Sequence, residues 1–172
     1  MEIHEVTPSL RQLARDMVET MYAAQGIGLA AQQVGHVLQL TVLDVRASDR
    51  PSQLILGGRE VPLEEHMPMV LLNPKITRQE GEEIGQEGCL SFPKIYADIP
   101  RASSIHVSAL TLDMHPLQFV ATGLLSRAIQ HETDHLHGVL FIDRALEKER
   151  VQLGAAVKKI ERETRATLRK KT

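Results

Sequence analysis

The chain has 172 residues, which is the size of one compact domain and excludes a large multidomain enzyme. With 42% hydrophobic and 24% charged residues, its composition is that of a globular protein and argues against a disordered chain or a fibre. The net charge of −2 gives no indication of DNA binding, the single cysteine excludes an internal disulfide framework, and no apolar run approaches the roughly 20 residues of a membrane helix. Because the first residues are acidic, unlike those of a signal peptide, we expect a cytoplasmic protein with no membrane or DNA partner.

Apolar residues recur at steps of three and four over residues 8–25, which predicts an amphipathic helix. Thr7 before Pro8 is a typical N-cap and first-turn pair, and Gly26 is predicted as the left-handed residue that follows the helix. The next segment, residues 26–33, reads Gly-Ile-Gly-Leu-Ala-Ala-Gln-Gln. It is too rich in small residues for a strand that only fills a core.

The middle of the chain is predicted to form strands, because Val, Leu and Ile are enriched there or alternate with polar residues. The predicted strands are residues 37–45, 69–76, 105–114 and 117–121. Asn73-Pro74 is expected to interrupt the second of these strands, and the fourth is expected to return antiparallel to the third. Residues 46–68 contain Ser, Gly, Pro and charged side chains, and they are predicted to form a surface loop or hairpin.

A second helix is predicted from Thr122 or Gly123 to about His137, ended by Gly138, and a last helix over residues 143–172. Helices at both ends and strands between them predict an α+β fold. In this fold, antiparallel sheets pack around a central helix that carries an HExxH motif, and a C-terminal helix follows. The whole chain, residues 1–172, is expected to form a single domain.

The HExxH motif is His131-Glu132-Thr133-Asp134-His135. Two histidines four residues apart share one face of a helix, so both imidazoles can bind one metal ion. Glu132 can contact a water molecule on that ion without being a ligand. The alternative is an exposed helix face with two solvated histidines, but the apolar residues before the motif favour a buried helix.

The third ligand is not fixed by this motif alone. Phe141 stands where metzincin proteases have a third histidine, so that pattern is excluded. Other zincins use a downstream glutamate, for which the candidates are Glu147, Glu149, Glu161 and Glu163. Cys89 is the better candidate because it is the only thiol and follows Gly88, although a lone cysteine is often only a small buried filler.

Three segments together resemble the peptide deformylases. Residues 26–33 match the first motif of that family, residues 87–91 (Glu-Gly-Cys-Leu-Ser) match the second, and residues 130–138 match the third. The three motifs also agree with the family in order and spacing, over about residues 10–150. The resemblance implies a metal-dependent hydrolase that removes the N-terminal formyl group from N-formylmethionyl nascent polypeptides.

The resemblance also implies a role for each matching residue. One divalent ion is expected on Cys89, His131 and His135, with water in the fourth position. The ion is expected to be Fe²⁺ in the cell, with Zn²⁺, Ni²⁺ or Co²⁺ as alternatives in the isolated protein. Metal-bound water or hydroxide would attack the formyl carbon. The catalytic residues implied are Glu132 as general base and then acid, with the Gln33 side-chain amide and the Leu90 backbone N–H as oxyanion donors.

The expected substrate contacts follow from the same matches. A cramped site beside Gly28 and Gly88 would admit a formyl group and reject an acetyl group. The residues expected to line an apolar pocket for the methionine side chain are Ile27, Ile84, Leu124 and Ala128, with His131 as one wall. Glu87 is expected to fix a ligand histidine or an arginine such as Arg101. Asp134 is expected to be a structural hydrogen-bond acceptor.

The last fifteen residues carry seven Lys and Arg against two Glu, a net charge of +5. In relatives, a basic C-terminal helix docks on the ribosome, so the resemblance implies a ribosome-docking tail within residues 143–172. Two alternative functions remain open from the sequence. One is a zincin-type metallopeptidase, which would not need Cys89. The other is a non-catalytic, ribosome-associated metal-binding relative, against which the presence of Glu132 and Gln33 argues.

Overall fold

The computed structural model describes residues 1–169. The chain divides into two compact units. Unit 1 comprises Met1–Glu83 and Arg101–Val139, and unit 2 comprises Ile84–Pro100 and the chain from Leu140 onward. Mixed helices and antiparallel strands confirm the predicted α+β class. Across the described residues, every helix is too short or too polar to span a lipid bilayer.

Unit 1 is built on a seven-stranded sheet with the strand order β1-β2-β5-β8-β9-β3-β4, and all of its pairings are antiparallel. The strands are β1 (Gly28–Ala30), β2 (Leu40–Leu43), β3 (Ser52–Leu56), β4 (Arg59–Val61), β5 (Met69–Glu80), β8 (Ser104–Leu110) and β9 (Pro116–Thr122). The β3–β4 pair confirms a hairpin within residues 46–68. Pairing of β8 with β9 confirms the predicted antiparallel return.

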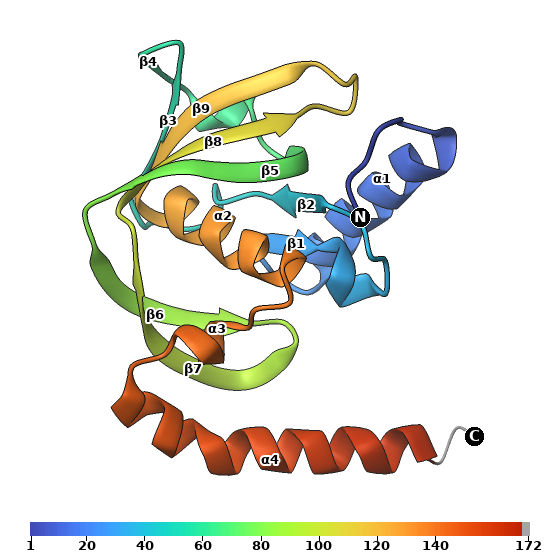
Figure 1. Ribbon diagram of the computed structural model, residues 1–172, viewed down its shortest axis with the longest axis vertical. Helices are drawn as coiled ribbons and strands as arrows, with labels where there is room; N and C mark the ends of the chain where they lie inside the picture. The colour runs from blue at the N-terminus through green and yellow to red at the C-terminus, as the bar shows by residue number, and fades with distance from the viewer. Residues whose placement is uncertain (170–172) are drawn as a thin grey trace. The chain divides into compact units, whose positions relative to one another are not determined.

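Two helices cover this sheet, α1 (Pro8–Ala23) and α2 (Gly123–Leu136) (Figure 1). Neighbouring residues of β5 pack with different helices: Leu71 belongs to the core cluster that contains α2, and Leu72 to the cluster that contains α1. Since successive side chains of a strand point to opposite faces, the two helices lie on opposite faces of the sheet. Short 3-10 turns occur at η1 (Ala31–Val34) and η2 (Leu63–Glu65).

The ends of α1 show how local signals set a helix. The Thr7 hydroxyl accepts a hydrogen bond from the Leu10 N–H at 3.2 Å, which confirms the predicted N-cap. The prediction for the other end is wrong, because Gln25, with φ of 54°, takes the left-handed position expected for Gly26. Hydrogen bonds from Gln25 N–H to the Tyr22 carbonyl and from Gly26 N–H to the Met21 carbonyl close the turn as a Schellman motif.

Strand β5 runs through the predicted interruption at Asn73 instead of stopping there. Asn73 has φ of 50°, and the register between β5 and β8 shifts between Leu72 and Lys75. Its side-chain amide also pairs with the backbone N–H and C=O of Ile3, both at 2.8 Å. A bulge therefore absorbs the irregular residue and anchors the N-terminal segment.

Unit 2 contains a hairpin of β6 (Glu83–Cys89) and β7 (Phe92–Arg101), each of which includes one residue of unit 1. Its helices are α3 (Phe141–Arg144) and α4 (Glu147–Arg169). Buried Ile95, Ala97 and Ile99 alternate along β7 and form the core of the unit with residues of α3 and α4. The last helix begins at Glu147 and not at residue 143, because Ala145 is extended and separates α3 from α4.

Candidate active site

Helix α2 is the structural centre of the site. Thirteen of its fourteen residues are buried, although several of them are polar. Ser126, Gln130 and Asp134 are spaced by four residues, so they lie in one stripe along the helix. A buried polar stripe of this kind needs hydrogen-bond partners, since each unpaired buried polar group costs about 1–3 kcal/mol.

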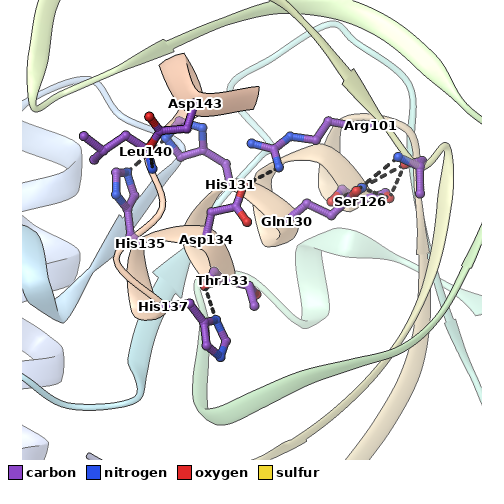
Figure 2. A network of polar contacts seen from close by, with 11 residues as sticks. Arg101, Ser126, Gln130, His131, Thr133, Asp134, His135, His137, Leu140 and Asp143 are labelled. Atoms are coloured by element: carbon purple, nitrogen blue, oxygen red, sulfur yellow. Dashed lines mark hydrogen bonds and ion pairs between the residues drawn. The ribbon is translucent and has the colours of Figure 1, made fainter. Parts of the chain in front are cut away.

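The stripe binds the backbone of Ala102 and the side chain of Arg101 (Figure 2). The Gln130 amide accepts from the Ala102 N–H at 3.1 Å and donates to the Ala102 carbonyl at 2.8 Å, and Ser126 Oγ donates to the same carbonyl. The Arg101 guanidinium donates to the Asp134 carboxylate at 2.6 Å, as a buried ion pair. Asp134 is thus a structural hydrogen-bond acceptor, as predicted.

His131 and His135 lie side by side on α2, and their Nε2 atoms are 3.2 Å apart. Their rings stand at 76° to each other with centroids 4.9 Å apart, and both side chains are buried. Two imidazole nitrogens bound to one tetrahedral ion at about 2.0–2.1 Å would be separated by about 3.3 Å. The observed spacing therefore suits the binding of a metal ion by both rings.

Other groups hold the end of this helix. The Gln39 side-chain amide donates to the carbonyl of Leu136, the last residue of α2, at 3.3 Å. His137 Nδ1 lies 2.7 Å from the Thr133 carbonyl and donates to it, so this exposed imidazole is engaged with the backbone.

Glu132, next to the first histidine, is buried against β1. A Cβ atom built on Gly28 would lie 2.4 Å from Glu132 Oε1 and 2.9 Å from its carboxyl carbon. Only a residue without a side chain leaves room for the carboxylate here. The contact explains why a glycine stands at this position of the first motif.

The 3-10 turn η1 presents Gln33. Its side-chain Oε1 accepts a hydrogen bond from the Ala30 N–H at 2.8 Å. Because this bond identifies the carbonyl end of the amide, the NH₂ end is the one that can donate to a developing oxyanion. Unit 1 therefore contains Gln33, Gly28 and Glu132 together with the histidine pair.

Unit 2 carries the second motif on β6. Glu87 is buried and Cys89 is half-buried, and these residues lie on one face of the strand. Ile84, which is 55% exposed, lies on the opposite face with Gly88. The ring of Tyr96 covers Gly88, where an added Cβ would meet two ring carbons at 2.8 Å.

Leu90, the expected oxyanion donor, follows β6 and is exposed. Among the predicted pocket residues, Leu124 and Ala128 are buried in the core cluster of unit 1, and Ile27 packs against that cluster. The candidate metal ligands are Cys89, at the end of β6 in unit 2, and His131 and His135, on α2 in unit 1.

Sequence reasoning missed two features near the site. Arg127 is buried on α2 and donates to the Glu83 carbonyl at 2.7 Å. Asp44, at the end of β2, is also buried and binds Tyr22 and Arg46. A charged residue within a buried apolar helix is a sequence signal for Arg127, but no local pattern points to Asp44.

The comparisons with known proteins agree with this geometry. The model of the polypeptide deformylase family matches residues 1–151. A peptide deformylase of Methylacidiphilum infernorum is 45% identical over 162 residues, covering 94% of this chain and 85% of that protein. One from Opitutus terrae is 47% identical over 160 residues, covering 92% of this chain and 83% of that protein.

A solved structure gives the same result for the fold. The crystal structure of a peptide deformylase from Synechococcus elongatus in complex with actinonin has a TM-score of 0.77 and 41% sequence identity. The match covers 94% of this chain and 78% of that one. The chain therefore belongs to the polypeptide deformylase family.

Proposed function

We propose that this chain is a metal-dependent hydrolase that removes the N-terminal formyl group from N-formylmethionyl nascent polypeptides. Relatives named peptide deformylase, at 45% and 47% identity, support the hydrolase activity. The observation that carries the proposal is the buried histidine pair, whose Nε2 atoms are separated by 3.2 Å beside Glu132. The family match over residues 1–151 supports one catalytic domain that includes both units.

The residues that would hold the metal are His131, His135 and Cys89. Two imidazoles and one thiolate form a donor set that accepts Fe²⁺, Ni²⁺, Co²⁺ or Zn²⁺, and we propose Fe²⁺ in the cell. When bound, a divalent ion at this position polarises a carbonyl oxygen and lowers the pKa of a water molecule towards neutrality. Glu87, buried on the Cys89 face of β6, is proposed to fix a neighbouring histidine or arginine.

The residues of the chain supply the proton transfers. Glu132 takes a proton from the attacking water and delivers it to the methionine nitrogen as the C–N bond breaks, so that formate and a free amine result. Gln33 NH₂ and Leu90 N–H donate hydrogen bonds to the oxygen on which negative charge develops. Each such donor is worth about 3 kcal/mol of the barrier.

The sheet supplies a surface for the peptide. Within the described sheet, β1 is a terminal strand with β2 as its partner, so the backbone of Gly26–Gly28 can pair with an extended substrate. The methionine side chain is proposed to occupy an apolar pocket beside His131. The residues proposed to line it are Ile27, Ile84, Leu124 and Ala128. Gly28 and Gly88 are proposed to keep the formyl site small.

The activity is tested with anaerobically purified protein, a metal analysis and formyl-Met-Ala-Ser as substrate. We expect release of formate and about one metal ion per chain. In Cys89→Ala we expect metal affinity to fall more than about tenfold, because even residues that only support a ligand contribute about 10–100-fold. A zincin-type peptidase would keep its metal in the Cys89→Ala variant. If the chain were a non-catalytic relative, even the wild-type protein would release no formate.

Helix α4 is proposed to dock on the ribosome through its basic residues, and the protein is accordingly proposed to act in the cytoplasm. Lys158, Arg162, Arg165 and Arg169 follow one another at steps of three and four along the helix. The remaining basic residues of the tail, Lys170 and Lys171, lie outside the described residues. Cations in such a stripe would bind ribosomal RNA phosphates in a salt-dependent manner.

Replacing these four residues by glutamine keeps Val157 and Ile160, which pack in the core of unit 2. We expect co-sedimentation with ribosomes at low salt to weaken about tenfold or more, because the phosphate contacts are lost. The matched control replaces four exposed basic residues of unit 1, Arg15, Arg59, Lys75 and Arg78. Equal binding of the two variants would contradict docking through α4.

A further inference from the structure

A hydrogen-bonded cluster lies at the end of β2, next to the first motif. Its centre is Asp44, which is only 6% exposed. The Asp44 carboxylate accepts from the Tyr22 hydroxyl at 2.6 Å and from the Arg46 guanidinium at 2.6 and 3.0 Å. It also accepts from the Arg46 backbone N–H at 3.1 Å. Four donors on one buried carboxylate make a rigid contact.

The ionisation of the cluster agrees with this geometry. Burial alone would raise the pKa of the Asp44 carboxyl, but hydrogen bonds from Arg46 and Tyr22 outweigh burial and hold this pKa below its usual value. The hydrogen bond to Asp44, followed by burial, raises the pKa of the Tyr22 phenol. At neutral pH the carboxylate is therefore charged and the phenol keeps its proton.

The cluster is joined directly to the first motif. The Asp44 backbone N–H donates to the Ile27 carbonyl at 2.9 Å, so Asp44 continues the β1–β2 pairing by one residue. On the other side, Tyr22 lies in the last turn of α1, and its carbonyl accepts the Gln25 N–H. The link from α1 to β1 is thus held at its start by the backbone of Tyr22 and at its end by the backbone of Asp44. The hydroxyl–carboxylate bond joins these two points.

The link itself needs this support. Gln25 adopts a left-handed conformation that is unfavourable for a residue with a side chain. Gly26, which follows it, has no side chain to limit its backbone. Without the Tyr22–Asp44 bond, the chain at Gly26 and Ile27 would have more conformations available.

We propose that Tyr22 and Asp44 are positioning residues that hold the backbone of Gly26–Gly28 ready to pair with the peptide downstream of formylmethionine. This inference rests on the proposed function and identifies the part of the substrate that the link recognises. Neither residue is proposed to touch the reacting atoms. Their effect should therefore depend on substrate length, because only a peptide longer than formylmethionine can pair with β1 beyond the reacting group.

The experiment compares Tyr22→Phe with the wild type on formyl-Met-Ala-Ser and on N-formylmethionine. Tyr22→Phe removes one oxygen atom and keeps the ring. We expect KM for the longer peptide to rise about tenfold with kcat unchanged, and kcat/KM for N-formylmethionine to stay within about twofold. Metal content should not change, because neither residue is a proposed ligand.

Two further variants and a hydrogen-exchange measurement separate a positioning role from a general effect on stability. Asp44→Asn should give the same dependence on length, and Asp113→Asn, which breaks an exposed ion pair with Arg11, should give none. In Tyr22→Phe, hydrogen exchange at the amides of Gly26 and Asp44 should be about tenfold faster than in the wild type.

Equal losses on the two substrates, or no loss on either, would overturn the positioning role. Unchanged amide exchange in Tyr22→Phe would overturn it independently of any activity. A wild-type enzyme that acts on neither substrate would contradict the proposed function instead, and the exchange measurement would still decide whether the link is held by Tyr22.

Discussion

Glu132→Gln is expected to lower kcat for formyl-Met-Ala-Ser by about 10³-fold. Glutamine has the volume and the hydrogen-bonding reach of glutamate, but it cannot accept the proton of the attacking water or deliver it to the amine. General acid–base catalysis of this kind is worth about 10²–10⁴-fold. Because Glu132 is not a proposed ligand, the metal content should equal that of the wild type. Steady-state formate release and metal analysis on the same sample provide the measurement.

A glutamate away from the site serves as the control. Glu65→Gln changes an exposed residue of η2 and should leave kcat unchanged. A Glu132→Gln enzyme that kept more than about a tenth of wild-type activity would show that another group moves the proton. Loss of metal from this variant would show that Glu132 is a ligand.

Gly28→Ala is expected to lower kcat by about 100-fold without unfolding the protein. The added Cβ would fall 2.4 Å from Glu132 Oε1, so the carboxylate must move. A displacement of about 1 Å of a catalytic group can cost about 100-fold in rate. The flexible end of the side chain can move at a smaller cost than backbone, so the effect on the melting temperature should be modest.

The matched control is Gly154→Ala in the middle of α4, where an added Cβ meets nothing within 4 Å. Alanine should stabilise this helix by up to about 1 kcal/mol and leave kcat unchanged. If Gly28→Ala had wild-type kcat, the close contact with Glu132 would not matter for catalysis. A large fall in melting temperature would instead place the role of Gly28 in folding.

The parts of the fold that depend on neighbouring residues could be predicted from the sequence. The beginning of α1 follows from Thr7 and Pro8, and the bounds of α2 follow from its apolar spacing and Gly138. The β6–β7 hairpin was not predicted, because glycines and charged residues dilute the pattern of β6. The alternation of Ile95, Ala97 and Ile99 along β7 was a usable signal.

For the site, too, contacts within one helix could be predicted from the sequence, whereas contacts between distant segments could not. The four-residue spacing of His131 and His135 predicts their proximity because helix geometry alone produces it. The approach of Gly28 to Glu132 joins residues over 100 positions apart, and no local pattern encodes such a contact. The bond between Tyr22 and Asp44 likewise depends on the packing of α1 against β2, which only the tertiary structure reveals.

The strand order of the sheet also determines when a newly synthesised chain can complete its fold. Within the described part of the sheet, the β3–β4 hairpin is joined through β9, and the paired residues Gln53 and Thr122 are 69 positions apart. Pairings of such long sequence separation form slowly, and strands that wait for a partner can associate with other chains. During translation this hairpin must therefore remain without its neighbour until β9 has left the exit tunnel, and over that interval it can associate with other chains.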